Sequence, residues 1–161
     1  MPSLHIQFGA QGQTPEGQTV QLPPSVGLLQ RGPLVQVSVR LFQDMANELT
    51  QRGIELPQPV SGIGLIDTGA SVTCIDESIA QNLRLPVVDV VPMASASHST
   101  TLRNVYPISF EIVNLVSNIN APRAIGAELN VQGLILLIGR DVLQFCTLFY
   151  NGFIGQITLS I

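Results

Sequence analysis

The chain has 161 residues, a length typical of one domain with its own hydrophobic core. Hydrophobic residues make up 45% of it and charged residues 11%, which excludes an intrinsically disordered chain. The net charge of −4 and the lack of a basic stretch argue against a nucleic-acid-binding protein, and no apolar run approaches the ~20 residues of a membrane span.

The first residues show no basic segment followed by an apolar one, so we expect no signal peptide and a cytoplasmic protein. The low charge content favours a buried subunit interface. Cys74 and Cys146 lack the spacing of a metal site, and we expect two reduced core thiols, although a disulfide stays open.

Residues 1–32 are rich in Gly, Gln and Pro and are expected to form an N-terminal arm, with one or two edge strands or a pro-segment as open alternatives. Residues 33–41 alternate apolar and polar, which predicts a half-buried strand. The connection over 43–60 is expected to contain a short helix at 44–52. Its two prolines, Pro57 and Pro59, exclude a central strand there.

Residues 62–67 predict a short apolar strand that runs into a polar turn. A short helix is expected over 75–85, with Asp76 as its N-cap and Ile75, Ile79 and Leu83 on one face. Pro86 ends that helix.

The second half of the chain also has a β pattern. Strands at 87–93 and 102–113 flank a small, polar segment at 94–101, which together predict a long hairpin. The apolar run 131–138 predicts a strand buried on both faces, and 141–145 predicts one or two helical turns. Two last strands within 146–161 are expected to meet at Asn151-Gly152, a dipeptide favoured in tight hairpins.

The segment that carries chemistry is Asp67-Thr68-Gly69-Ala70, which directly follows the apolar strand. Glycine allows a tight turn that brings backbone N–H groups close to a carboxylate, and a threonine hydroxyl can donate and accept hydrogen bonds. The alternative is a turn in which Asp67 only caps its own backbone.

This tetrapeptide resembles the active-site signature of retropepsin-like aspartic proteases. Residues 136–143, with Gly139-Arg140 after three apolar residues, resemble the segment that ends the catalytic core of that family. The hairpin between the two motifs resembles the flap. The resemblance covers residues 33–161 and implies an all-β fold: a closed, barrel-like acid protease with a flap hairpin and one or two short helices.

The resemblance also implies an aspartic endopeptidase that acts on extended polypeptides without a metal or cofactor. The chain holds a single Asp-Thr-Gly motif, so the second carboxylate must come from a second copy. Two Asp67 carboxylates about 3 Å apart would share a proton, the ionised one activating water and the protonated one donating to the scissile carbonyl. The alternatives are a dimeric binding or assembly module on the same fold, with weak or no proteolysis, and a structural β-domain.

Other roles follow from the resemblance by position. Thr68 is expected to hydrogen-bond across the dimer beneath the acids, and the carbonyl of Gly69 to meet the substrate backbone. Ala70 supplies no hydroxyl to stabilise the carboxylate, so we expect a mildly acidic pH optimum. Ser71 stands where viral members often carry an acid that pairs with the later Arg. This leaves Asp141 or a backbone carbonyl as the partner of Arg140.

The flap tip is expected at 95–100 and differs from the Gly-rich tip of viral members. Its small side chains suit a lid that binds substrate as an added β-strand. His98 is expected to be a solvated loop residue, with a substrate contact as the alternative. The candidate substrate-binding residues of the flap are Ser95, Ala96, Ser97, His98 and Ser99.

Overall fold

The strand expected over residues 33–41 is β4, Leu34–Leu41, and its alternation decides which side meets the core. Val35, Val37, Val39 and Leu41 are buried, whereas the residues between them are more exposed. The structure, a computed structural model, describes residues 2–95, 98–115 and 117–161.

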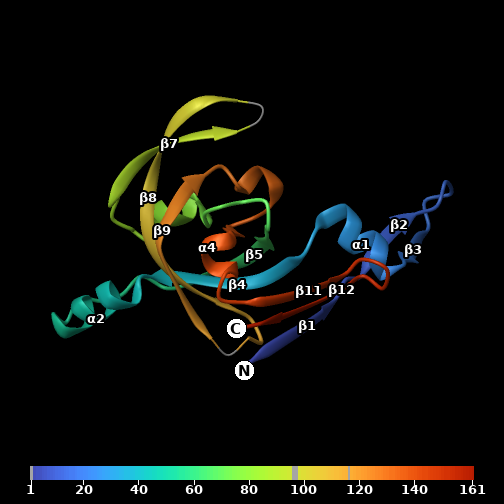
Figure 1. Cartoon of the computed structure of the whole chain (residues 1–161), viewed down its shortest axis with the longest axis horizontal. Helices are drawn as coiled ribbons and strands as arrows, with labels where there is room; N and C mark the ends of the chain where they lie inside the picture. Colours follow the sequence, from blue (N-terminus) through green and yellow to red (C-terminus); the bar gives the residue numbers. More distant parts are fainter. Residues whose placement is uncertain (1, 96–97, 116) are drawn as a thin grey trace.

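Six strands close into a barrel in the order β4-β5-β10-β6-β9-β8, because β4 also pairs with β8 (Figure 1). Two pairs, β5 with β10 and β6 with β9, are parallel and the others are antiparallel. The strand β7 extends the sheet by pairing with β8 in a long hairpin. The remaining bounds are β5 Val60–Ile66, β6 Cys74–Asp76, β7 Asp89–Ser95, β8 His98–Ile112, β9 Asn118–Ala127 and β10 Leu136–Ile138. The all-β class and the hairpin expected from the sequence are confirmed.

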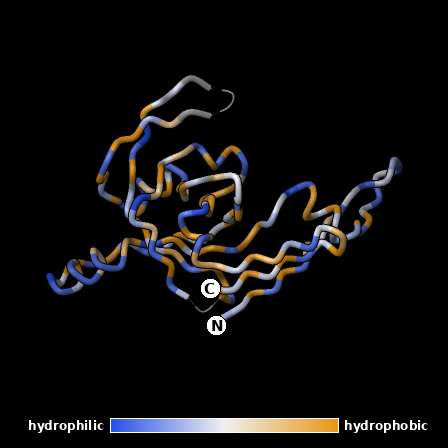
Figure 2. The backbone as a smooth tube through the Cα atoms, viewed as in Figure 1, coloured by the Kyte–Doolittle hydropathy of each residue, from blue (hydrophilic) through white to orange (hydrophobic). Residues whose placement is uncertain are grey.

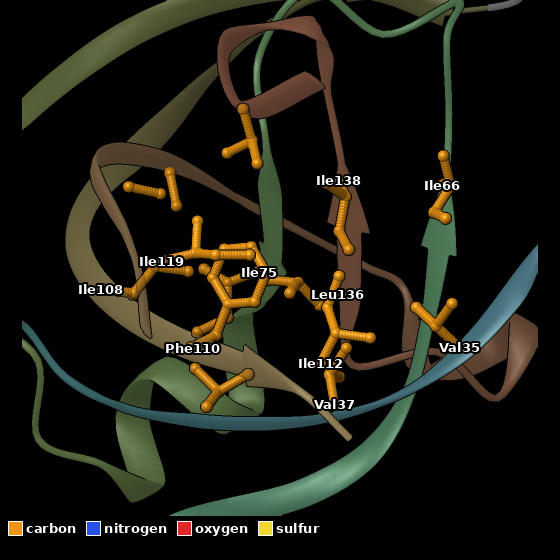
Figure 3. Packing of buried hydrophobic residues seen from close by; sticks show 14 of the residues in the cluster. Val35, Val37, Ile66, Ile75, Ile108, Phe110, Ile112, Ile119, Leu136 and Ile138 are labelled. Carbon is orange, nitrogen blue, oxygen red and sulfur yellow. The ribbon is translucent and has the colours of Figure 1, made fainter. Parts of the chain in front are cut away.

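Apolar side chains from all six barrel strands fill the interior. Figure 3 shows Ile66 and Ile138 on neighbouring strands, above Leu136, Val35 and Val37. Phe110, Leu136 and Ile138 are fully buried. Burial of an aliphatic or aromatic side chain contributes about 1.5–3 kcal/mol, so this core stabilises β5 and β10.

A second sheet lies beside the barrel and joins the two ends of the chain. It is antiparallel, in the order β1-β12-β11, with β1 at Ser3–Gln7, β11 at Thr147–Asn151 and β12 at Gln156–Ser160. The rest of the N-terminal segment forms the hairpin of β2, Ala10–Gln13, and β3, Thr19–Leu22, followed by α1, Pro24–Arg31. Residues 1–32 thus contain more regular structure than the sequence indicates. A separate role for this arm stays a prediction.

The other helices are short. The helix α2, Gln43–Gln51, confirms the helix expected at 44–52, but none of its residues is buried and it projects from the barrel (Figure 1). Figure 2 shows hydrophilic and hydrophobic residues alternating along it. The helix α3, Glu77–Asn82, is capped by Asp76, which accepts a hydrogen bond from the N–H of Ser78 at 3.0 Å. This confirms Asp76 as the N-cap, whereas Ile75 belongs to β6 and not to the helix.

Two further expectations need correction. The strand expected over 131–138 is only β10, because Asn130–Gln132 form a 3₁₀ turn and Gly133 has a left-handed backbone, with φ of 71°, that ends any extended run. Val131 is accordingly exposed. The last hairpin does not turn at Asn151-Gly152 alone, since Asn151 pairs with Gln156 and Gly155 supplies the positive φ. No helix in the described part of the chain is long and apolar enough to cross a membrane.

Candidate functional site

Asp67 follows the last residue of β5 and lies where the parallel strands β5 and β10 end together. Ile66 is in register with Ile138, and the N–H of Asp67 donates to the carbonyl of Ile138 at 2.9 Å. The ladder therefore extends to the acid itself, which fixes its backbone while its side chain stays half-buried.

The turn after Asp67 directs backbone N–H groups at the carboxylate. Oδ1 accepts hydrogen bonds from the N–H of Gly69 at 2.7 Å and from that of Ala70 at 3.3 Å. Among the described residues, no hydrogen bond reaches Oδ2. One oxygen of the carboxylate is thus held by the turn.

Arg140 joins this turn from the other motif. Its Nη1 donates to the carbonyl of Thr68 at 2.8 Å and to that of Gly69 at 2.9 Å. Of the two partners left open by the sequence, the backbone carbonyls are the ones that Arg140 contacts. A charged donor makes stronger hydrogen bonds than a neutral one, so Arg140 stiffens the turn that holds Asp67.

A second connection between the two motifs runs through Thr73 and was not predicted from the sequence. The N–H and hydroxyl of Thr73 donate to Oδ1 of Asp141, at 2.9 and 2.8 Å, and the hydroxyl accepts from the N–H of Gly139 at 3.1 Å. Two backbone hydrogen bonds lie beside them: the N–H of Arg140 donates to the carbonyl of Ala70, and the N–H of Asp141 donates to the carbonyl of Ser71. A threonine four residues after Gly69 carries no signal by itself, because its partner lies far along the chain.

Gly139 marks the place where the two motif segments touch. A Cβ at this position would lie 2.5 Å from the carbonyl carbon of Val72 and 2.8 Å from the nitrogen of Thr73. Both are backbone atoms that cannot move aside easily. The glycine of the second motif is therefore required by close packing of the two segments.

Two carboxylates lie near the buried thiol of Cys74. Burial, together with the charges of Asp141 and Asp67, raises the pKa of the Cys74 thiol to about 11. Cys74 is therefore a protonated, unreactive thiol at neutral pH. Cys74 and Cys146 are both free, as expected. No group of three or more His, Cys, Asp or Glu suited to a metal ion occurs among the described residues.

A pocket of about 330 Å³ opens beside Asp67. It is bordered by Asp67 and Thr68, by the end of α1 with the residues after it, and by Leu148 and Tyr150 of β11. Thr68 and Gly69 are exposed. The surface next to the carboxylate is thus open to a further molecule.

The expected flap residues lie at the far end of the β7–β8 hairpin, which stands out from the barrel in Figure 1. Ser95 pairs with His98, so the strands reach the expected tip. His98 begins β8 and is not the loop residue expected from the sequence, and Ser99 continues the strand. Ala96 and Ser97 lie outside the described residues. The role of these five residues in substrate binding stays a prediction.

Comparison with solved structures finds distant similarity to viral and bacterial proteases. One is a retropepsin-like aspartic protease from Rickettsia conorii, with 12% identity, a TM-score of 0.45 and coverage of 98% of this chain and 90% of that one. Another is the protease of simian foamy virus, with 12% identity, a TM-score of 0.44 and coverage of 70% and 93%.

A third similar structure is the foamy viral protease-reverse transcriptase bound to an RNA/DNA hybrid, with 18% identity and a TM-score of 0.44. The match covers 70% of this chain and 12% of that polypeptide, so this chain spans about an eighth of its length. No family model matches the chain, and no curated protein matches its sequence. At identities of 12 to 18%, the likeness to these structures concerns the fold.

Proposed function

We propose that this chain is an aspartic endopeptidase that forms its active site from two copies of Asp67 in a homodimer. The observation that carries the proposal is the environment of the carboxylate. Oδ1 is held by two backbone N–H groups of a turn that is bonded to the second motif, and the surface beside it is open. A capping aspartate in an ordinary turn would not need the supports from Arg140, Thr73 and Gly139.

The chemistry requires two carboxylates that share one proton. Two negative charges about 3 Å apart repel strongly, so the pair keeps one proton at the pH where it works. The ionised Asp67 takes a proton from a water molecule, which attacks the scissile carbonyl. The other Asp67 donates its proton to the carbonyl oxygen and so stabilises the tetrahedral intermediate.

The turn contributes by holding each carboxylate still. Hydrogen bonds from Gly69 and Ala70 fix the plane of the Asp67 side chain, and Arg140 fixes the carbonyls behind it. Orientation of this kind removes much of the entropic cost of bringing acid, base and water together. The β7–β8 hairpin is proposed to cover the substrate and to bind its main chain.

The test is cleavage of a denatured protein and of a peptide library between about pH 4 and 7, the range in which a shared-proton carboxylate pair works. Wild type is compared with Asp67→Asn and with the control Asp44→Asn, which makes the same change on the exposed helix α2. We expect activity in wild type and Asp44→Asn and none in Asp67→Asn. A folded wild-type dimer that cleaves nothing at any pH would favour the binding-module alternative.

A further inference from the structure

A second pocket, of about 840 Å³, lies between α2 and the end of α3. Its apolar lining comes from the end of β4, from α2, from the segment after α2 and from the end of α3. These apolar residues include Leu41, Met45, Leu49, Ile54, Leu56 and Leu83. A concave and mainly apolar surface of this size is typical of a ligand site.

The helix α2 leaves this pocket open because it covers the barrel only in part. Ala46 and Leu49 pack against the main core, but no residue of α2 is buried. Beside the helix, Ile54 is 43% exposed. Apolar side chains on two walls thus line a space that the described part of the chain does not fill.

The pocket also carries one charge of each sign, on Glu55 and Arg84. Neither side chain forms an ion pair with another of the described residues, so the two charges are not paired with each other. Together they select neither an anion nor a cation. Affinity at this pocket must therefore come from burial of apolar groups and from main-chain hydrogen bonds.

The segment after α2 offers main-chain groups as well as side chains. The N–H groups of Glu55, Leu56 and Gln58 donate to no backbone carbonyl within residues 2–95, 98–115 and 117–161. A proline follows Leu56 and another follows Gln58, which favours an extended backbone at both positions. An extended segment with unpaired main-chain groups beside apolar pockets is the kind of surface that binds another extended polypeptide.

The strand β5 connects this pocket with the candidate active site. Gln58 lies two residues before β5, and Asp67 follows its last residue. The seven residues of β5, at about 3.3 Å each, span roughly 23 Å. In Figure 1, α2 lies on the opposite side of the barrel from α1, whose end borders the pocket beside Asp67. The two pockets are therefore separate sites.

We propose that the pocket beside α2 is a second binding site for the polypeptide substrate, which holds an extended apolar segment far from the scissile bond. The inference rests on the proposed function, which supplies the polypeptide. An extended chain covers about 3.3–3.6 Å per residue, so a substrate needs at least about seven residues beyond the scissile bond to reach the pocket. The site binds substrate and transition state equally, so it lowers KM and leaves kcat unchanged.

The test compares one short peptide that wild type cleaves with two longer versions of it. Each longer version carries about twelve further residues, enough to reach the pocket, attached in turn to either end. One extension alternates Val and Ser, and the other contains only Ser and Thr. We expect the Val-Ser extension at one end to lower KM at least about tenfold with unchanged kcat, and the Ser-Thr extension to have no effect.

Two variants place a charge on different walls of the pocket, Ile54→Glu after α2 and Met45→Glu on α2. The matched control is Val113→Glu, because Val113 is 46% exposed, close to the 43% of Ile54, and lies in the turn after β8, outside the pocket. Both pocket variants should raise the KM of the Val-Ser peptide to that of the short peptide, which they should cleave like wild type. Val113→Glu should cleave every peptide like wild type.

A binding measurement does not depend on how these variants fold. The Val-Ser extension is added as a free peptide to Asp67→Asn, and amide hydrogen exchange should slow at Glu55, Leu56 and Gln58. Equal KM values for the two longer peptides, or unchanged exchange at these residues, would overturn the inference while cleavage of the short peptide leaves the proposed function standing. Slowed exchange in a protein whose wild type cleaves no peptide would overturn the proposed function, and with it the role of the bound chain as a substrate.

Discussion

Thr73 and Asp141 lie 68 positions apart in the chain and are joined by two hydrogen bonds to one carboxylate oxygen, at 2.9 and 2.8 Å. Through the same hydroxyl, Thr73 also accepts from the N–H of Gly139. These bonds fasten the segment after Asp67 to the start of α4, Arg140–Leu143. The geometry of the candidate site therefore depends on residues outside both sequence motifs.

Removal of the Thr73 hydroxyl should loosen this connection. Thr73 is fully buried, so Thr73→Val leaves the N–H of Gly139 without its acceptor and removes one of the hydrogen bonds to Oδ1 of Asp141. We expect the free energy of unfolding to fall by about 2 kcal/mol, together with a loss of peptidase activity. Urea unfolding measures the first, and Thr73→Ser, which keeps the hydroxyl, is the control. Equal stability of the Val and Ser variants would contradict this role.

Gly139→Ala should disrupt the contact between the two motif segments. The added methyl group would lie 2.5 Å from a backbone atom of Val72, so either segment must move. We expect a loss of about 1–3 kcal/mol in unfolding free energy and the loss of activity. Gly9→Ala is the matched control, because nothing lies within 4 Å of its Cβ. Thermal unfolding and cleavage assays measure both effects, and an active Gly139→Ala enzyme would refute the packing argument.

Arg140→Met should show whether Arg140 positions the turn that holds Asp67 or only stabilises the fold. Arg140 is exposed, so its loss leaves no buried charge, but the carbonyls of Thr68 and Gly69 lose their donor. We expect a decrease in kcat with little change in KM, and a stability loss of about 1 kcal/mol. Arg52→Met, on an exposed arginine after α2, is the control. A purely structural role would lower stability and leave kcat per folded dimer unchanged.

The barrel strands could be predicted where periodicity is local. The alternation of β4 and the apolar run before Asp67 indicate the correct strands, and both motifs lie at strand ends as expected. The N-cap of α3 could be predicted in the same way, because Asp76 lies two residues before Ser78 and accepts from its N–H.

Long-range geometry could not be predicted in this way. Val131 continues an apolar run in the sequence, yet Gly133 adopts a left-handed backbone and turns the segment into a 3₁₀ helix. The hydrogen bonds between Thr73 and Asp141 depend on which segments the closed barrel brings together, and local sequence patterns carry no information on that. The same holds for Arg140, whose carbonyl partners are found only in the folded chain.

Asp76 should make stability depend on pH. It is 2% exposed, and although burial alone would raise the pKa of its carboxyl, hydrogen bonds from Ser78, Asn130 and Leu129 hold that pKa below its ordinary value. A carboxyl whose pKa is lower in the folded than in the unfolded state stabilises the fold above the unfolded pKa of about 3.9, and the stabilisation is lost as pH falls toward the folded value.

Asp76→Asn should therefore lower Tm at neutral pH and flatten its decline in acid. The amide cannot accept all the hydrogen bonds of the carboxylate, which include those from the N–H groups of Leu129 and Asn130 at 2.9 and 2.8 Å. Tm is measured from about pH 7 down to about pH 3, with Asp44→Asn as the exposed control. If wild type and Asp76→Asn lose stability in parallel throughout this range, Asp76 is not the source of the acid sensitivity.

The sharing of one active site by two chains can be tested by mixing. When wild type is unfolded, mixed with Asp67→Asn and refolded, random pairing gives wild-type homodimers in proportion to the square of the wild-type fraction. A mixture of equal parts should contain about one quarter of such homodimers, so activity per wild-type chain should fall to about half. Mixing with Asp44→Asn, which keeps its Asp67, is the control and should leave activity per competent chain unchanged. The reason is chemical: a dimer with one Asp67 has an acid or a base but cannot hold both in alternate protonation states. If total activity instead falls linearly with the wild-type fraction, activity per wild-type chain stays constant. That result would mean that each chain works alone.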